Sequence, residues 1–225
     1  MKFLKALILF SVLLSFSANA LLEVNIIKSK EELFPVVIAP FEIIGDAHQG
    51  ADIANIIRDN LNRSGQFNAL TTNELVTNQI DFDFWQEHNK DAVVFGKVEQ
   101  VSSKVFNIYI YIYDVFSEKS LYAKKIAVHN SGIRRIAHYL SDRIYYVLLG
   151  QKGSFDTRLS YVTVSESKKG NRTYRLQISD SDGYNPQTVV KSAHPILSPS
   201  WSSDQNKLAY VSFKNNRSEV FVIYP

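Results

Sequence analysis

The acids are the first residues to test for chemistry in this sequence, and their spacing decides what they can do. Asp180-Ser-Asp182-Gly183 is similar to a calcium loop, but an EF-hand with Gly183 in sixth place would need acids at Ile178 and Val189. We therefore expect a tight turn there, in which Gly183 takes a positive φ. Asp81 and Asp83 are paired carboxylates on a polar segment that provides no perturbed environment, so we expect no acid–base catalysis from them.

The other reactive residue types also lack the spacing of a known site. No pair of histidines has a His-x-x-x-His spacing, so we expect surface or capping roles for His48, His88, His129, His138 and His194. There is no cysteine and no Gly-x-Ser-x-Gly, and Gly45 and Gly50 do not form a phosphate-binding loop. The sequence therefore predicts a protein that is not an enzyme and has neither a metal site nor a cofactor.

A repeat near the C-terminus carries more information than any of these residues. The run Arg158–Val164 (RLSYVTV) returns as Lys207–Phe213 (KLAYVSF), and Asn171–Ile178 (NRTYRLQI) returns as Asn216–Ile223 (NRSEVFVI). Each unit is predicted to be a hairpin of two short strands joined by a polar turn. The period of about 45 residues is typical of propeller blades. Trp201, in Pro-Ser-Trp, is expected where the blades pack together.

The first 20 residues have the three parts of a secretory signal peptide. Lys2 and Lys5 precede an apolar run, and Ala18-Asn-Ala20 supplies the small residues of a cleavage site. The run is short for a membrane span, so we expect cleavage after Ala20 and export to the periplasm instead of an uncleaved anchor. Loss of both lysines reduces a formal net charge of +3 to near neutrality, which gives no reason to expect nucleic-acid binding.

Hydrophobic periodicity organises residues 21–150 into one domain. The expected strands are 34–40, 91–98, 104–114 and 121–128, and the expected helices are 51–61, 82–85 and 133–149. Ser131 is the expected N-cap of the last helix, Gly150 its stop, and Arg134, Arg135, Asp142 and Arg143 its solvated face. The predicted fold class is an α/β or α+β domain with a mixed sheet and two main helices. A linker at 151–157 and incomplete all-β blades at 158–225 are expected to follow it.

Tyr109, Tyr111 and Tyr113 share one face of the strand at 104–114. Such a row either stacks on a ligand or packs under a helix. We expect packing, because amphipathic rings suit a half-buried sheet.

The C-terminal sequence resembles that of one known family. The runs DGYNPQT (182–188), PSWSSDQNKLAYVSF (199–213) and NRSEV (216–220) are similar to the TolB family, the periplasmic propeller proteins of the Tol-Pal system. The resemblance extends over the whole chain, including the α/β region. A propeller closes a ring of several blades, so the chain looks like a member of this family cut short after about one and a half blades.

The resemblance implies a non-catalytic adaptor. Such a protein would bind the lipoprotein Pal through its propeller and TolA through an N-terminal arm, here about residues 21–32, and would support outer-membrane integrity and constriction during cell division. The implied TolA contacts are Leu22, Glu23, Val24, Asn25 and Ile26. The implied Pal contacts are His194, Pro195 and Ser198. From the residues alone, 22–27 is equally well an edge strand of the first domain.

Two other functions remain open at this stage. One is an accessory cap and propeller fragment of a secreted hydrolase, and the other is a small α/β nucleic-acid module, which the signal peptide and weak charge disfavour. An incomplete ring also predicts exposed blade residues. We expect partial exposure of Leu208, Tyr210, Phe221 and Ile223.

Overall fold

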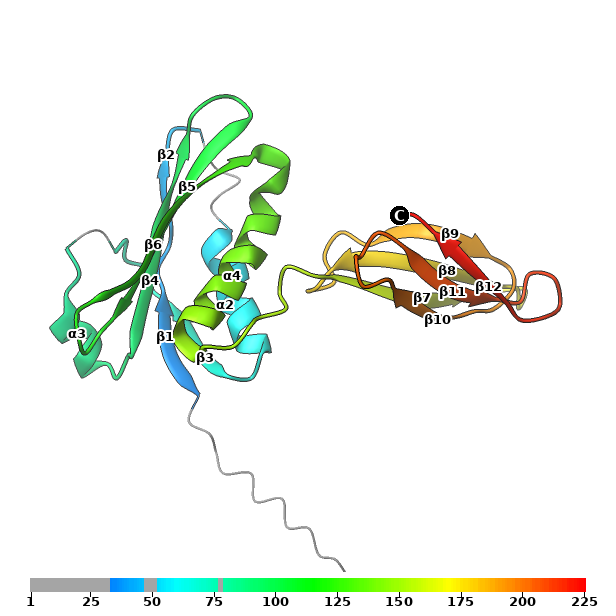
Figure 1. Cartoon of the computed structure of the whole chain (residues 1–225), viewed down its shortest axis with the longest axis horizontal. Coiled ribbons are helices and arrows are strands. Elements are labelled where there is room, and N and C mark those ends of the chain that lie inside the picture. Colours follow the sequence, from blue (N-terminus) through cyan, green and yellow to red (C-terminus); the bar gives the residue numbers. More distant parts are fainter. Residues whose placement is uncertain (1–32, 47–51, 77–78) are drawn as a thin grey trace, which may run out of the picture. The chain divides into compact units, whose positions relative to one another are not determined.

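The computed structural model of the chain describes residues 33–46, 52–76 and 79–225 (Figure 1). The expected signal peptide and the arm residues Leu22, Glu23, Val24, Asn25 and Ile26 lie outside these described residues. Within the described part, no helix combines the length and the apolar character needed to cross a membrane.

The first region is built on a mixed sheet of six strands. Its strands are β1 Phe34–Ile38, β2 Glu42–Ile44, β3 Phe67–Thr71, β4 Ala92–Gln100, β5 Val105–Asp114 and β6 Ser120–His129. The order is β3-β1-β4-β5-β6, and β2 also pairs with β4. β1 runs parallel to β3 and β4, whereas β4, β5 and β6 are antiparallel neighbours. The four expected strands are present, and the short β2 and β3 are additional.

Two long helices cover one face of this sheet, and a short helix covers part of the other (Figure 1). The long helices are α2 Ile53–Arg63 and α4 Ile133–Leu149, and the short one is α3 Phe82–Glu87. Ile53, Ile57 and Leu61 follow one another at one-turn intervals and are completely buried against the sheet. The predicted mixed sheet with two main helices is therefore confirmed.

The tyrosine row on β5 divides into two environments. Tyr111 and Tyr113 stack against Phe95, with ring centroids 5.1 and 5.9 Å apart, and pack in the small core that includes Trp85 of α3. For these two, packing under a helix is confirmed. Tyr109 lies beyond that cover, where its ring contacts Lys97 and its hydroxyl donates to Oε2 of Glu99 at 3.0 Å. That hydrogen bond is the main reason why the pKa of Glu99 is lowered.

Helix α4 has the predicted bounds, Ile133–Leu149, but Ser131 is not its N-cap. Ser131 lies inside a 3-10 turn at Asn130–Gly132, and Gly132 is the N-cap. The Ser131 hydroxyl is 3.0 Å from Nδ1 of His129, so it serves the preceding turn instead of the first helical amides. Gly150 ends the helix as predicted, because its φ of 70° lets its N–H turn back to the carbonyl of Tyr146.

The C-terminal region consists of two three-stranded antiparallel sheets. The first contains β7 Arg158–Glu166, β8 Arg172–Asp180 and β9 Gln187–Ser192, and the second contains β10 Ile196–Trp201, β11 Leu208–Ser212 and β12 Glu219–Ile223. Both predicted hairpins, β7–β8 and β11–β12, are present, and β9 and β10 form from the link between them. Within the described residues the sheets do not close a ring. The predicted fold class is thus confirmed.

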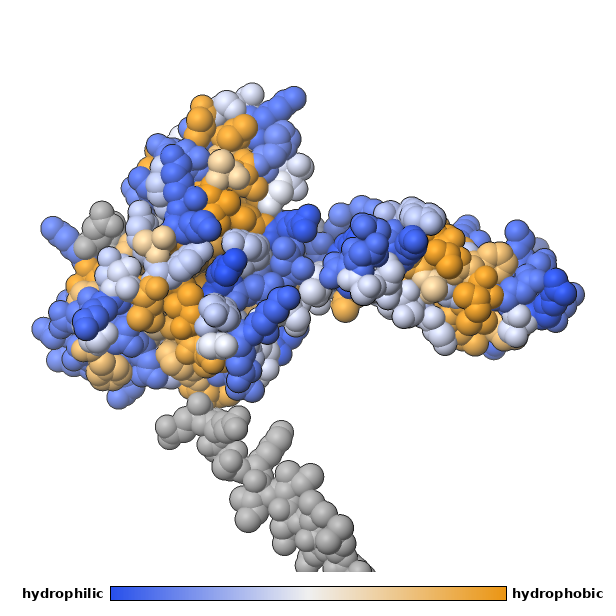
Figure 2. Space-filling model, viewed as in Figure 1, coloured by the Kyte–Doolittle hydropathy of each residue, from blue (hydrophilic) through white to orange (hydrophobic). Residues whose placement is uncertain are grey.

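The two blade sheets share one apolar core, so the expected partial exposure is wrong for Leu208 and Tyr210 and is confirmed for Phe221 and Ile223. Leu208 is fully buried and Tyr210 is 8% exposed, because β11 packs with Leu176 and Ile178 of β8. Phe221 and Ile223 lie partly buried against this core. Apolar residues still reach the surface of both regions (Figure 2). On the blades the exposed ones include Leu159, Val164, Leu197, Val220 and Val222.

Gly96 tests the packing of the first region. A Cβ at this position of β4 would fall 2.5 Å from Cε1 of Phe41 and closer still to the carbonyl oxygen of Tyr109. Gly96→Ala should therefore lower the free energy of unfolding by about 3 kcal/mol, measured by chemical denaturation. The matched control is Gly132→Ala, whose new Cβ would meet only Cγ2 of Val128 at 3.1 Å. Equal losses in the two variants would contradict this packing.

Candidate functional site

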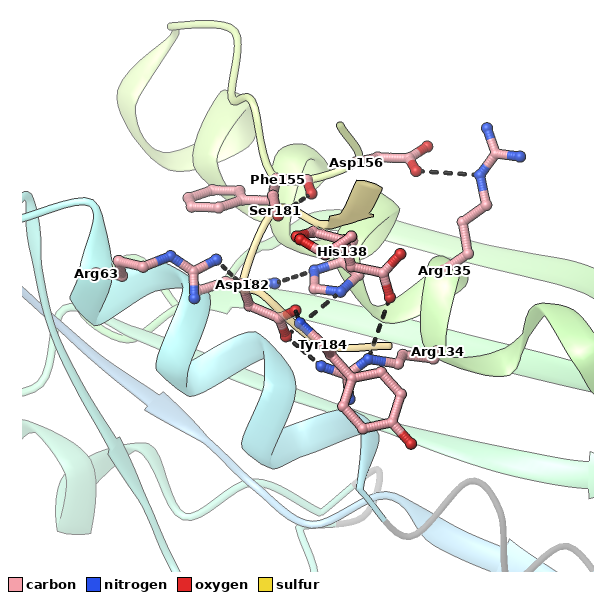
Figure 3. A network of polar contacts seen from close by, with 12 residues as sticks. Arg63, Arg134, Arg135, His138, Phe155, Asp156, Ser181, Asp182 and Tyr184 are labelled. Atoms are coloured by element: carbon pink, nitrogen blue, oxygen red, sulfur yellow. Dashed lines mark hydrogen bonds and ion pairs between the residues drawn. The ribbon is translucent and has the colours of Figure 1, made fainter. Parts of the chain in front are cut away.

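A network of polar contacts lies where α4 meets the turn after β8 (Figure 3). Arg134, His138 and Asp142 are one helical turn apart, so they form a stripe along one side of α4. Their side chains contact the first blade and the segment that leads into it. We call the following residues the junction cluster: Asn60, Arg134, His138, Ser141, Asp180, Asp182 and Tyr184.

His138 is the buried centre of this cluster. Its side chain is 3% exposed, and its Nδ1 lies 2.9 Å from Nδ2 of Asn60. The same amide nitrogen donates to Oγ of Ser141 at 2.8 Å, because the Ser141 hydroxyl donates its own proton to the carbonyl of Ala137. Oδ1 of Asn60 accepts from Arg63 at 2.7 Å, which fixes the orientation of the amide. Nδ1 of His138 is therefore an acceptor, and the proton of the neutral ring sits on Nε2.

Arg134 supplies the positive charge of the cluster. Its guanidinium donates to Oδ2 of Asp182, lies 3.4 Å from Oδ2 of Asp180 and stacks on the Tyr184 ring at 3.8 Å from the centroid. The turn itself is the one expected at Asp182-Gly183. Gly183 has a φ of 83° and donates to the carbonyl of Asp180, and the Tyr184 N–H donates to Oδ1 of Asp182.

The carboxylates and the histidine do not form a free cation site. Oδ2 of Asp182 lies 3.7 Å from Nε2 of His138, and Asp180 is close enough for all three groups to share a cation. The guanidinium of Arg134 is already that cation. Burial lowers the pKa of His138, and the neighbouring Asp182 partly offsets this effect.

Asp142 fixes the segment between α4 and the first blade. Its Oδ1 accepts from the N–H of Phe155 at 2.8 Å and its Oδ2 accepts from the N–H of Asp156 at 3.0 Å. Asp156 in turn pairs with Arg135, and the carbonyl of Phe155 accepts from the hydroxyl of Ser181 at 2.6 Å. The expectation of a solvated face on α4 is therefore wrong for Arg134 and Asp142.

Two cavities flank the junction cluster. One, of about 410 Å³, has a polar lining of alternating charge: Arg135, His138, Asp156, Arg158, Asp180 and Asp204. The other, of about 370 Å³, is lined by Arg63, Lys152, Ser181 and the rings of Tyr145 and Phe155. Two members of the junction cluster, His138 and Asp180, line the polar cavity, and of these His138 is the buried one. The sequence prediction of a surface or capping role is therefore wrong for this histidine.

The residues predicted to contact Pal lie on the second blade. His194 is exposed in the loop before β10, and its N–H donates to Oγ of Ser192 at 2.9 Å. Ser198 is exposed within β10, at a register shift, and has a φ of 50°. The carbonyl of Pro195 accepts from the N–H of Phe213, which fixes the loop on the sheet. All three residues lie on the stretch that leads into and through β10.

The carboxylates at positions 81 and 83 have a structural role. Oδ1 of Asp81 accepts from the N–H of Phe84 at 2.9 Å and caps α3, and Asp83 lies in the first turn of that helix.

Family models match the chain in two consecutive stretches. The model of the TolB amino-terminal domain matches residues 22–121, and that of the TolB beta propeller domain matches residues 145–224. The chain is 60% identical over 208 residues to a Tol-Pal system protein TolB of Ruthia magnifica, covering 92% of this chain and 49% of the relative. It is 37% identical to the protein of the same name from Nitrosococcus oceani, covering 92% and 48%.

A solved structure agrees with these sequence matches. The crystal structure of TolB from Acinetobacter baumannii superposes with a TM-score of 0.75 at 34% identity, covering 86% of this chain and 47% of that one. The chain thus spans about half the length of the relatives that it matches.

The bonds of Asp142 give a direct test of the junction. Asp142→Ala removes two acceptors of backbone N–H groups at 155 and 156, so the free energy of unfolding should fall by about 2 kcal/mol. The segment 151–157 should also be cut faster in limited proteolysis. Asp59→Ala is the matched control, because Asp59 is an exposed helical aspartate that, among the described residues, pairs only with its neighbour Arg58. It should change stability by less than about 0.5 kcal/mol. Unchanged stability and cleavage in Asp142→Ala would contradict this role.

Proposed function

The chain belongs to the TolB family, and on that premise we propose that it is a non-catalytic periplasmic component of the Tol-Pal system. In this role it binds TolA through its arm and Pal through its propeller surface. Through these partners it serves outer-membrane integrity and constriction during cell division. The observation that carries the proposal is the pair of consecutive TolB matches, which together extend over both regions of the chain.

The domain division of the proposal follows the sequence prediction. Residues 1–20 are a signal peptide cleaved after Ala20, and 21–150 form the α/β domain with an arm at about 21–32. Residues 151–157 are the linker, and 158–225 are the first blades. One core unites both blade sheets, and Asp142 ties the linker to α4.

The proposed TolA contacts are Leu22, Glu23, Val24, Asn25 and Ile26. Alternating apolar and polar residues suit a strand that adds to the sheet of a partner, because main-chain hydrogen bonds then provide affinity and every second side chain provides specificity. Binding of this kind needs only the arm. It is therefore independent of how many blades follow.

The proposed Pal contacts are His194, Pro195 and Ser198. The first and last of these are exposed, and the hydrogen bond from Phe213 to the carbonyl of Pro195 holds the loop in place. A loop surface of one blade is a small interface, and stable interfaces bury about 800 Å² on each partner. We propose that tight Pal binding requires the loops of further blades.

The relatives reported above are all named for TolB and none for a hydrolase. They therefore favour the adaptor over an accessory fragment of a secreted hydrolase. They equally favour it over a nucleic-acid module.

Binding measurements on the chain without residues 1–20 test both halves of the proposal. We expect TolA binding, measured by calorimetry, and Pal binding at least about 100-fold weaker than that of a full-length TolB relative, because the loop surface of one blade is small for a stable interface. Val24→Asp should abolish TolA binding by placing a charge in the added strand. Lys30→Ala, near the other end of the arm, is the matched control and should bind as the parent chain does.

Two results would count against the proposal. TolA binding that is indifferent to Val24→Asp would show that the arm is not the contact. Pal binding as tight as that of the full-length relative would show that one blade loop suffices.

A further inference from the structure

His138 stands apart from the other described histidines because it is buried and its Nε2 has no hydrogen-bond acceptor among the described residues. That nitrogen carries the proton of the neutral ring and points to Oδ2 of Asp182, 3.7 Å away (Figure 3). One side of the ring is thus bonded to α2 through Asn60, and the other faces the turn of the first blade. No part of the proposed adaptor function uses this arrangement.

The geometry points to His138 as a proton-sensitive latch: the β8–β9 turn packs over the neutral ring, between α2 and α4, and uptake of a proton loosens that packing. This inference goes beyond the proposed function and does not depend on which partners the chain binds.

The hydrogen bonds around the ring give the first reason. A second proton has to go on Nδ1, where it would face the amide nitrogen of Asn60, which is also a donor. Turning the Asn60 amide over would supply an acceptor there. The same rotation would then present its NH₂ group to the guanidinium of Arg63, which now donates to Oδ1 at 2.7 Å. Protonation therefore breaks at least one buried bond of the cluster, and a buried polar group without a partner is unfavourable.

The surrounding charges give the second reason. Every element packed against the ring brings charged groups, and they nearly balance. From α4 and α2 come Arg134 and Arg63, and from the end of β8 and its turn come Asp180 and Asp182. The adjoining cavity adds the lining residues Arg135, Asp156, Arg158 and Asp204. Because Arg134 already pairs with both carboxylates of the turn, an imidazolium gains only part of their attraction.

The direction of the pH effect follows from burial. Burial lowers the pKa of the docked His138 beneath the ordinary value of about 6.5, to which the ring returns when the turn moves away and water reaches it. The loosened state therefore takes up the proton more readily. Docking of the β8–β9 turn on α2 and α4 is therefore strongest above about pH 6.5. It weakens as the pH falls toward the lower pKa of His138 in the docked state. The cavity of about 410 Å³ beside the ring offers the proton a route.

Distance measurements between two nitroxide labels test the latch. The chain has no cysteine of its own, so labels at the exposed positions Glu118→Cys and Lys168→Cys report on the α/β region and the first blade. On lowering the pH from about 7.5 to about 5.5, the fraction of molecules outside the docked distance should rise several-fold, up to about tenfold for one proton and an undocked pKa of about 6.5.

Two histidine variants show whether His138 is responsible. His138→Gln keeps a donor and an acceptor but cannot titrate, so its docked fraction should not change between the two pH values. His129→Gln, at an exposed histidine, should respond as the parent chain does. A pH response that persists in His138→Gln, or none in the parent chain, overturns the latch.

Nuclear magnetic resonance of the ring nitrogens covers the case in which His138→Gln does not fold. In the parent chain at pH 7.5 the spectrum should show a neutral His138 with its proton on Nε2, and this ring should titrate below the ordinary pKa of about 6.5. A proton on Nδ1, or a charged ring at pH 7.5, would rule the latch out.

Discussion

The pairing of Arg134 with the carboxylates of Asp180 and Asp182 is the interaction on which the junction of the two regions depends. The Arg134 side chain is 28% exposed and that of Asp182 is 16% exposed, so the pair is partly screened from water. Exposed surface ion pairs in proteins generally contribute at most about 1 kcal/mol. Removing one member of a buried pair costs about 3–5 kcal/mol, because the other charge is left without a partner. The Arg134 pairs lie between these limits, and the stacking on Tyr184 adds to them.

The same pairing explains why the cluster holds one geometry. Arg134 fixes the two carboxylates, and Asp182 then faces Nε2 of His138, whose other nitrogen is fixed by Asn60. Each of these side chains is thus oriented by its neighbour in the cluster. A cluster that links α2, α4 and a blade turn in this way responds as a unit, so a change of charge at the ring reaches a turn that is more than 40 residues away in the sequence.

The fold was largely predictable because its apolar patterns are strong and local. The helical spacing of Ile53, Ile57 and Leu61 predicts the inner face of α2. The alternation of apolar and polar residues on β5 predicts that Ile108 and Ile110 lie in the core. The repeat likewise predicts both hairpins of the blades. It does not predict that β11 is buried, because that depends on how one blade sheet packs on the other, and a sequence repeat describes only the unit.

The junction cluster was harder to predict, although part of its signal is present in the sequence. Arg134, His138 and Asp142 recur at every fourth position of the expected helix, and this spacing puts them on one side. A polar stripe on a helix normally faces water, which is why the sequence predicts a solvated surface there. The partners of the stripe come from Asn60 on one side and from the Asp182 turn on the other, and neither periodicity nor spacing relates such distant segments. A charged stripe on a helix that precedes a short linker is therefore better read as a docking face for the domain that follows.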